Sequence, residues 1–365
     1  MTVNRRDLLS ASALLLAGPA LSLRLASART PGAAPIVLCW NENPYGPSPA
    51  ARAAVARSIA QGCRYPSDAE ILDLEQAIAR HEGTATEHIV TGSGSGELLC
   101  ALALLCGLDG GEILAAEPTY LELTDYAHGI GVPIRFVPVD AGLAHDLPAM
   151  HAAISASTRA VYLCNPNNPT GTALPAAEIR AFIANLPPAV VAIVDEAYMD
   201  FATGADVRSV ADLVGGERQV VVLRTFSKLH GMAGMRMGYA VTRPELVKRL
   251  KQARMTTPNI LAVRAARTSL DDREFLTATR AKILASRTRI TAELTRLKLR
   301  YAPPQGNFVF FDTGMPLATY AQRMKERNVL VGRRFAPYDS WCRITIGTEP
   351  EVEAFLQALR ASVHG

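Results

Sequence analysis

The chain has 365 residues, of which 49% are hydrophobic and 20% are charged, and its formal net charge at pH 7 is +4. A chain of this length can bury a large core and exceeds the size of one small domain. Its positive charge is small and scattered, so the composition implies no nucleic-acid partner.

The first 28 residues show the sequence of regions that is typical of a secretory signal peptide. A charged start contains the pair Arg5-Arg6, and an apolar Ala/Leu-rich run then ends at Ala26-Ser27-Ala28. This ending is typical of a cleavage site, and the paired arginines resemble a twin-arginine (Tat) export signal. We expect residues 1–28 to be a Tat-type signal peptide cleaved after Ala28. The mature protein is then periplasmic or otherwise exported, without stable membrane insertion, and it is cytoplasmic if the signal is not used.

An uncleaved membrane anchor is the alternative for this segment. The apolar run is short for a bilayer span and is interrupted by Ser, Gly and Pro, which favours the signal peptide.

The cysteines predict neither a disulfide framework nor a metal site. They are dispersed, several lie inside apolar segments, and the sequence has no CxxC pair and no histidine cluster with metal-ligand spacing. We expect buried free thiols at all six positions. These are Cys39, Cys63, Cys100, Cys106, Cys164 and Cys342.

Short apolar runs alternate with helical periods up to about residue 244. The helical periods cover 97–106, 120–129 and 176–185. Runs closed by Gly, Pro, Asn or Asp predict buried strands at 89–90, 112–116, 134–138, 160–164, 190–194 and 220–223. This βαβ rhythm predicts an α/β fold, with a mainly parallel sheet that carries helices on both faces.

The rhythm changes beyond residue 244. A long charged helical stretch at 244–297 precedes a proline-rich turn, and a last helix begins at residue 351. Three further strands are predicted in between, at 308–311, 329–331 and 343–346. We expect three regions after the signal: an N-terminal segment at 29–60 that joins the small domain, a large domain at 61–245 and a smaller α+β domain at 246–365.

Polar motifs follow the predicted strands, where open α/β sheets bind their ligands. Ser227-Lys228 comes after the strand at 220–223, and Arg236 lies eight residues later in a Gly/Met-rich loop. An amine here could bond covalently to an aldehyde, while the hydroxyl and the guanidinium hold a phosphate. The dipeptide alone is far more typical of a solvated lysine, and only the other motifs favour the functional interpretation.

Asp195 directly follows the apolar strand predicted at 190–194. A buried carboxylate is costly unless it meets a cation, and a protonated pyridine nitrogen is such a cation. The ring then acts as an electron sink for a carbanion at the substrate's Cα. A helix cap is the plainer interpretation of Asp195.

The turn at 164–171 is rich in proline and asparagine. Its two prolines would aim the amide of Asn168 rigidly, and an X-Pro bond here could be cis. Together with Tyr198, that amide could bind a phenolic oxygen. An ordinary turn would need no ligand at all.

The Gly/Ser loop at 91–97 opens a helix after a short strand. Its small residues let backbone amides approach a phosphate, which the helix dipole also favours. The loop matches no standard phosphate-binding motif and could be a plain connection. After another strand, Tyr120 could stack on an aromatic ring, or it is an ordinary half-buried tyrosine.

In this order, the motifs resemble the class I/II, fold-type I aminotransferases that use pyridoxal 5′-phosphate (PLP), and most closely their histidinol-phosphate aminotransferase branch. The resemblance runs from about residue 38 to the C-terminus. It rests on NENPYGPSP (41–49), RYP (64–66), GSGSGE (92–97), PTY (118–120), NPNNPTG (165–171), DEAY (195–198), SK (227–228), GNF (306–308) and CRITIGT (342–348).

The resemblance implies three groups of site residues. Catalysis falls to Lys228, which forms the Schiff base with PLP, and to Asp195 and Tyr198. The cofactor contacts are Ser95, Gly96, Tyr120, Asn168, Asp195, Tyr198, Ser227, Lys228 and Arg236, with Tyr65 reaching the phosphate from the second subunit of a homodimer. The substrate contacts are Arg343, which pairs with the carboxylate, and Tyr45, Asn307 and Arg333.

The implied reaction is a ping-pong transfer of an amino group between an amino donor and a 2-oxo acid, of the histidinol-phosphate:2-oxoglutarate type. This chain departs from the family at two positions. Gly96 stands where members commonly carry an acidic residue, and the arginine expected for the substrate's phosphate is offset to Arg333. An aromatic amino-acid aminotransferase, an enzyme similar to threonine-phosphate decarboxylase, and a PLP-binding protein without turnover remain alternatives.

Overall fold

The computed structural model describes residues 34–363, and residues 35–363 belong to one compact unit. The predicted signal peptide at 1–28 lies outside the described residues. Within them, no helix combines the length and the apolar character needed to cross a bilayer.

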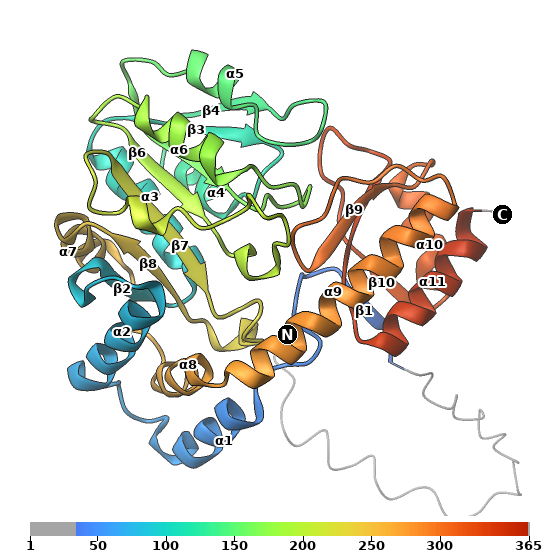
Figure 1. The fold of residues 1–365 in the computed structure, drawn as a ribbon, viewed down its shortest axis with the longest axis horizontal. Helices are drawn as coiled ribbons and strands as arrows, with labels where there is room; N and C mark the ends of the chain where they lie inside the picture. The colour runs from blue at the N-terminus through green and yellow to red at the C-terminus, as the bar shows by residue number, and fades with distance from the viewer. Residues whose placement is uncertain (1–33, 364–365) are drawn as a thin grey trace, which may run out of the picture. The chain divides into compact units, whose positions relative to one another are not determined.

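A seven-stranded sheet with the order β2-β8-β7-β6-β5-β3-β4 organises the larger part of this unit (Figure 1). All six strands predicted before residue 244 belong to it, so the expected α/β fold with a mainly parallel sheet is confirmed. The bounds are β2 Ile89–Gly92, β3 Glu112–Glu117, β4 Ile134–Pro138, β5 Thr158–Cys164, β6 Val191–Asp195, β7 Gln219–Thr225 and β8 Gly238–Thr242. The strand β8 was not predicted, and it runs antiparallel to both β2 and β7.

Side chains alternate between two hydrophobic cores, one on each face of this sheet. On β7, Val220 and Val222 enter one core while Val221 and Leu223 enter the other, as the two-residue period of a strand requires. The first core is covered by α1 (Pro49–Ser58), α2 (Asp68–Glu82), α5 (Leu147–Ala152), α6 (Ala176–Ala184) and α8 (Ile260–Asp271). The second is covered by α3 (Ser95–Leu108), α4 (Glu122–Gly129) and α7 (Pro244–Ala253).

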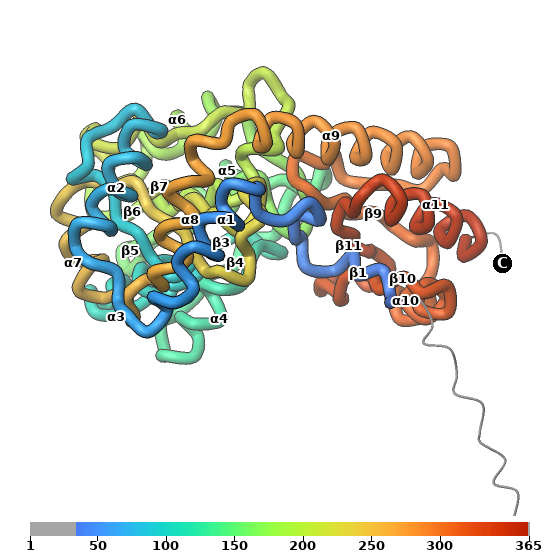
Figure 2. The backbone as a smooth tube through the Cα atoms, turned by 90° about the horizontal axis from the view of Figure 1, so that it is seen from below, coloured from blue at the N-terminus to red at the C-terminus, as the bar shows by residue number. Residues whose placement is uncertain are grey.

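A separate core lies among the later elements and the first strand (Figure 2). The strand β1 (Ile36–Leu38) pairs in parallel with β10 (Val329–Val331), and β9 (Phe308–Asp312) pairs antiparallel with β11 (Trp341–Thr345). The helices here are α9 (Arg273–Arg296), α10 (Leu317–Glu326) and α11 (Glu349–Val363). Leu38 is buried in this core, so the segment that follows the predicted signal packs with the C-terminal elements.

The single helical stretch predicted at 244–297 is three helices, and this part of the prediction is wrong. The chain leaves α7 before Pro258, and Asp272 caps α9 by accepting from the amide of Phe275 (3.3 Å). The helix α8 packs against α1 and α2, and α7 packs against α3. Both helices thus cover the seven-stranded sheet, although the sequence pattern assigned them to the smaller domain at 246–365. The boundaries of the domains stay a prediction.

All six cysteines are free, as predicted. Cys106, Cys164 and Cys342 are buried, whereas Cys39 and Cys100 are half-buried. The expectation of burial is wrong for Cys63, which is exposed because it lies in the connection between α1 and α2.

Candidate active site

A cavity of about 440 Å³ opens where several strands of the sheet end, and it brings together most of the predicted site residues. Those that line it are Ser95, Gly96, Tyr120, Asn168, Asp195, Tyr198, Ser227, Lys228, Arg236, Arg333 and Arg343. Tyr45, Tyr65 and Asn307 are not among the lining residues.

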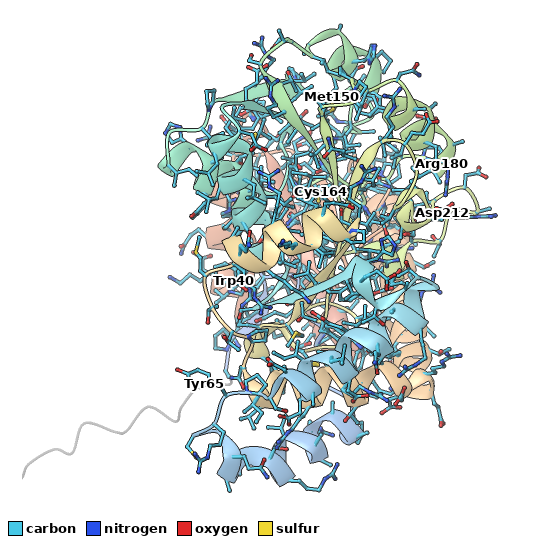
Figure 3. All side chains as sticks on the ribbon, turned by 90° about the vertical axis from the view of Figure 1, so that its left-hand side faces the viewer. Trp40, Tyr65, Met150, Cys164, Arg180 and Asp212 are labelled. Atoms are coloured by element: carbon cyan, nitrogen blue, oxygen red, sulfur yellow. The ribbon has the colours of Figure 1, made fainter. Side chains whose placement is uncertain are left out.

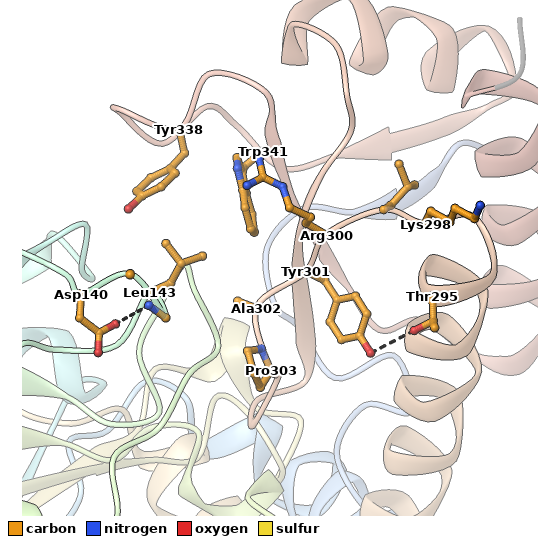
Figure 4. Close-up of a pocket in the computed structure, with 13 residues that line it drawn as sticks. Asp140, Leu143, Thr295, Lys298, Arg300, Tyr301, Ala302, Pro303, Tyr338 and Trp341 are labelled. Atoms are coloured by element: carbon orange, nitrogen blue, oxygen red, sulfur yellow. Dashed lines mark hydrogen bonds between the residues drawn. The ribbon is translucent and has the colours of Figure 1, made fainter.

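A second cavity, of about 810 Å³, lies between the loop 140–143 and the segment 295–303 (Figure 4). Aromatic rings such as Tyr301, Tyr338 and Trp341 line much of it, and none of the predicted site residues does. Its arginine, Arg300, is already paired with Asp312 (2.6 Å). The enclosed amine and carboxylate described next place the chemistry in the first cavity.

Lys228 follows the end of β7 and points into the first cavity. Its Nζ donates to the backbone oxygen of Asn41 (3.1 Å) and lies 5.4 Å from the ring centroid of Tyr198. Burial, reinforced by the positive charge of Arg343, lowers the pKa of Lys228 to about 8. A substantial fraction of the amine is therefore neutral near pH 8, which is the nucleophilic form.

Asp195 is the last residue of β6 and is 1% exposed. Its carboxylate accepts from the amide of Ala197 (3.1 Å) and from the hydroxyl of Tyr162 (3.2 Å). Burial raises the pKa of Asp195 to about 6, and among residues 34–363 no salt bridge to this carboxylate is formed. A carboxylate enclosed in this way is suited to a cationic nitrogen supplied by a ligand.

Asn168 connects two parts of the cavity. Its amide nitrogen donates to the hydroxyl of Tyr198 (3.4 Å), and its oxygen accepts from Nη1 of Arg343 (2.6 Å). The peptide bonds before Pro166 and Pro169 are cis, as the sequence suggested. Arg343 also donates from Nη2 to the oxygen of Cys39 (2.7 Å), while its buried Nε meets no acceptor in the described part of the chain.

The start of α3 forms an anion site. Gly94 precedes the helix with φ +86° and provides no side-chain cap, so the first amides, at Ser95 and Gly96, remain available. A Cβ on Gly94 would lie 2.5 Å from Nη2 of Arg236, so only glycine lets the guanidinium approach the loop this closely. Arg236 itself has φ +60°, a strained value for a side-chain-bearing residue that places its charge at this loop.

Three predicted residues lie outside the cavity lining. Tyr65 is 86% exposed in the connection between α1 and α2 (Figure 3). Tyr45 packs against the C-terminal core, and Nζ of Lys282 lies 5.1 Å from its ring centroid. Asn307 is buried and donates to the backbone oxygens of Asn41 and Glu42, both at 3.1 Å. Asn307 therefore supports the carbonyl that accepts from Lys228 and does not face the cavity directly.

Sequence reasoning missed several residues of the site. Trp40, which is 67% exposed, and Phe335 both line the cavity (Figure 3 labels Trp40). The guanidinium carbons of Arg333 and Arg343 lie 4.5 Å and 5.0 Å from the ring centroid of Phe335. Tyr162 could have been noticed as the one hydroxyl in an apolar strand, whereas Trp40 and Phe335 carried no such signal.

The chain matches the aminotransferase class I and II family over residues 33–359. It belongs to this family. The aminotransferase is 37% identical over 329 residues to a histidinol-phosphate aminotransferase of Moorella thermoacetica, covering 89% of this chain and 84% of the relative. It is 38% identical over 331 residues to an aromatic amino acid aminotransferase of Rhodococcus jostii, covering 89% of each.

The solved structures include a histidinol-phosphate aminotransferase from Sinorhizobium meliloti in complex with pyridoxal-5′-phosphate. It superimposes with a TM-score of 0.83 at 28% identity and covers 91% of each chain. The predicted cofactor is therefore confirmed: the enzyme is a PLP-dependent transaminase. The cavity fits PLP, because it offers a buried carboxylate for the ring nitrogen, an amine for the aldehyde and an anion site for the phosphate.

Proposed function

We propose that this transaminase moves an amino group between histidinol phosphate and 2-oxoglutarate. The observation that carries the proposal is the pair of guanidinium groups in one cavity, with Arg333 and Arg343 on the same phenylalanine ring. Both substrates bear an anionic group beyond the reacting carbon, a phosphate in the donor and a second carboxylate in the acceptor. Arginine forms paired hydrogen bonds with either group.

Five of the lining residues have defined tasks in this reaction. When bound, PLP withdraws electrons from the substrate's Cα. Lys228 would hold PLP by a covalent bond to its aldehyde carbon and, once the donor amine has taken its place, would carry a proton between the substrate's Cα and the cofactor. Asp195 keeps the ring nitrogen protonated, and Asn168 and Tyr198 donate to the phenolic oxygen. Arg343 orients the carboxylate of 2-oxoglutarate.

A screen of donors and acceptors tests the substrate assignment. Purified holoenzyme is incubated with histidinol phosphate, histidinol, and the aromatic and aliphatic amino acids, each with 2-oxoglutarate, and glutamate formation is measured. We expect the highest kcat/KM with histidinol phosphate and at least a tenfold loss with histidinol. Equal rates with both amines would contradict the proposal, and release of CO2 without glutamate would point to a decarboxylase.

An aromatic amino-acid aminotransferase is the second candidate. Trp40 and Phe335 give the cavity two aromatic surfaces, and the relative from Rhodococcus jostii carries that activity in its name. Preference for phenylalanine or tyrosine in the same screen would favour it over histidinol phosphate.

Replacing Arg343 with lysine is expected to lower kcat/KM for 2-oxoglutarate about 100-fold, mainly through KM. A charge-assisted hydrogen bond contributes about 1.5–3 kcal/mol, and lysine cannot reproduce the two-pronged geometry. Steady-state kinetics measure this, with Arg300→Lys in the second cavity as the matched control. Unchanged KM in Arg343→Lys would remove Arg343 from carboxylate binding.

We propose that the enzyme works as a homodimer in which Tyr65 reaches the phosphate of the other subunit. Its support is the 86% exposure of this tyrosine, together with the exposed Trp40 (67%) and Met255 (58%). Light scattering should give twice the chain mass, and Tyr65→Phe should weaken PLP binding without dissociating the dimer. A fully active monomer would exclude the shared site.

Export through a twin-arginine signal also remains a proposal. It is supported by Arg5-Arg6 and by the A-x-A ending at Ala28. Protein recovered from the periplasmic fraction should begin at Arg29; cytoplasmic protein that keeps residues 1–28 would contradict it.

A further inference from the structure

The carboxylate of Glu122 lies in the space beside Gly96, at the rim of the cavity. A Cβ built on Gly96 would lie 3.1 Å from Oε1 of Glu122 and 3.3 Å from its carboxyl carbon. The other oxygen, Oε2, accepts from the hydroxyl of Tyr120 (3.0 Å). A single side chain thus links the glycine at the start of α3 to the tyrosine that lines the cavity.

We propose that Glu122 is a positioning residue that holds the ring of Tyr120 against the PLP ring, and that Gly96 lacks a side chain to leave room for it. The inference rests on PLP filling the cavity. No sequence pattern pointed to Glu122, because the contact joins α3 to α4 across the rim.

The backbone around Tyr120 is fixed separately from its ring. The oxygen of Pro118 accepts from the amide of Asn167 (3.1 Å), and the hydroxyl of Thr119 donates to the same residue (2.9 Å). These bonds anchor the loop that leaves β3. Within the described part of the chain, the bond to Glu122 is the one that reaches the hydroxyl at the end of the tyrosine side chain, so it controls the orientation of the ring.

The hydrogen bond keeps its direction across the working pH range. Burial, followed by the negative charge of Glu122, raises the pKa of Tyr120 above its ordinary value of 10.0. The phenol therefore stays protonated and donates, while the carboxylate accepts. Glu122 is also the first residue of α4, where the helix dipole favours a negative charge.

The test compares Glu122→Ala, Glu122→Gln and Tyr120→Phe holoenzymes. The rate of PLP release and the visible circular dichroism of the bound cofactor are measured, because both report how the ring is held even without turnover. We expect Glu122→Ala to release PLP about three- to tenfold faster and to lose part of the dichroism, since one charge-assisted hydrogen bond is removed. Glu122→Gln keeps an acceptor and should stay within about twofold of wild type.

Two further comparisons separate positioning from a general loss of structure. Tyr120→Phe should match Glu122→Ala, and the double variant should be no worse than either single variant, because both remove the same bond. Gly96→Ala should displace the carboxylate of Glu122 and release PLP as fast as Glu122→Ala does. The double variant Gly96→Ala/Glu122→Ala should release PLP no faster than either single variant. Asp125→Ala, an exposed carboxylate one turn along α4, is the matched control.

Additive effects in the Tyr120→Phe/Glu122→Ala cycle, or wild-type release and dichroism in Glu122→Ala, would overturn the proposal. A failure of the underlying assignment is distinguishable, because wild-type protein would then bind no PLP and show no absorbance at roughly 410 to 430 nm, where lysine-bound PLP absorbs.

Discussion

Replacing Lys228 with alanine is expected to lower kcat by about 10⁴-fold, because the variant loses both the nucleophile and the group that moves the proton between Cα and C4′. Its Nζ lies inside the cavity, 3.1 Å from the oxygen of Asn41, and its pKa is lowered to about 8. The purified variant should also lose the absorbance band of covalently bound PLP, although the phosphate site still binds the cofactor. Stopped-flow kinetics and absorbance spectra measure the two effects.

Lys248→Ala provides the control, since this lysine is exposed on α7 and is not among the residues that line the cavity. It should leave kcat and the spectrum unchanged. If Lys228→Ala keeps more than about a tenth of wild-type kcat, another group carries the proton, and the assignment of Lys228 fails.

The second large effect is expected for Asp195→Asn, which should lower kcat by about 10³-fold while making the cofactor-free protein more stable. An asparagine cannot keep the ring nitrogen protonated, so electron withdrawal by the ring weakens. Without PLP, however, the buried carboxylate of Asp195 accepts hydrogen bonds from just Ala197 and Tyr162 among residues 34–363. Removing its charge relieves that desolvation.

The stability effect has a defined pH dependence. The pKa of Asp195 is raised from 3.8 to about 6 on folding, so the folded state favours the protonated acid. The contribution of Asp195 to the stability of the apoprotein is therefore fully present below about pH 4 and is lost as the pH rises through about 6, by on the order of 3 kcal/mol. The asparagine of Asp195→Asn does not titrate. The difference in stability between this variant and the wild-type apoprotein should therefore grow between pH 4 and pH 6.

Thermal or denaturant unfolding of both apoproteins at pH 4, 6 and 8 measures this difference. With PLP bound, the order should reverse, because the ring nitrogen then partners the wild-type carboxylate. Equal apoprotein stabilities at all three pH values would show that Asp195 bears no unpaired charge.

The sequence predicted the sheet well because its strands are apolar runs closed by turn residues. The strands at 134–138 and 329–331 have the predicted bounds. It missed β8, whose first residue continues a Gly/Met-rich loop and whose antiparallel course interrupts the βαβ rhythm. It also joined α7, α8 and α9, since their charged faces share a helical period and their breaks depend on packing.

The cavity itself could be predicted to a similar degree. Asp195, Asn168 and Lys228 each follow a strand, and carboxyl ends of parallel strands meet at one edge of a sheet. The contacts of Glu122 and Trp40 depend on how separate elements pack, which no local pattern encodes. Asn307 lies in a recognisable motif, yet only the fold reveals that it holds a carbonyl behind the cavity.

The position of Asn41 between Lys228 and β11 has a consequence for biosynthesis. The amide of Asn41 donates to the hydroxyl of Thr345, a contact that spans 304 positions, and the oxygen of the same asparagine accepts from Lys228. Such high contact order means that Asn41 must wait for a residue near the other end of the chain before this contact can form. The surroundings of Lys228 are therefore complete only once β11 has been synthesised.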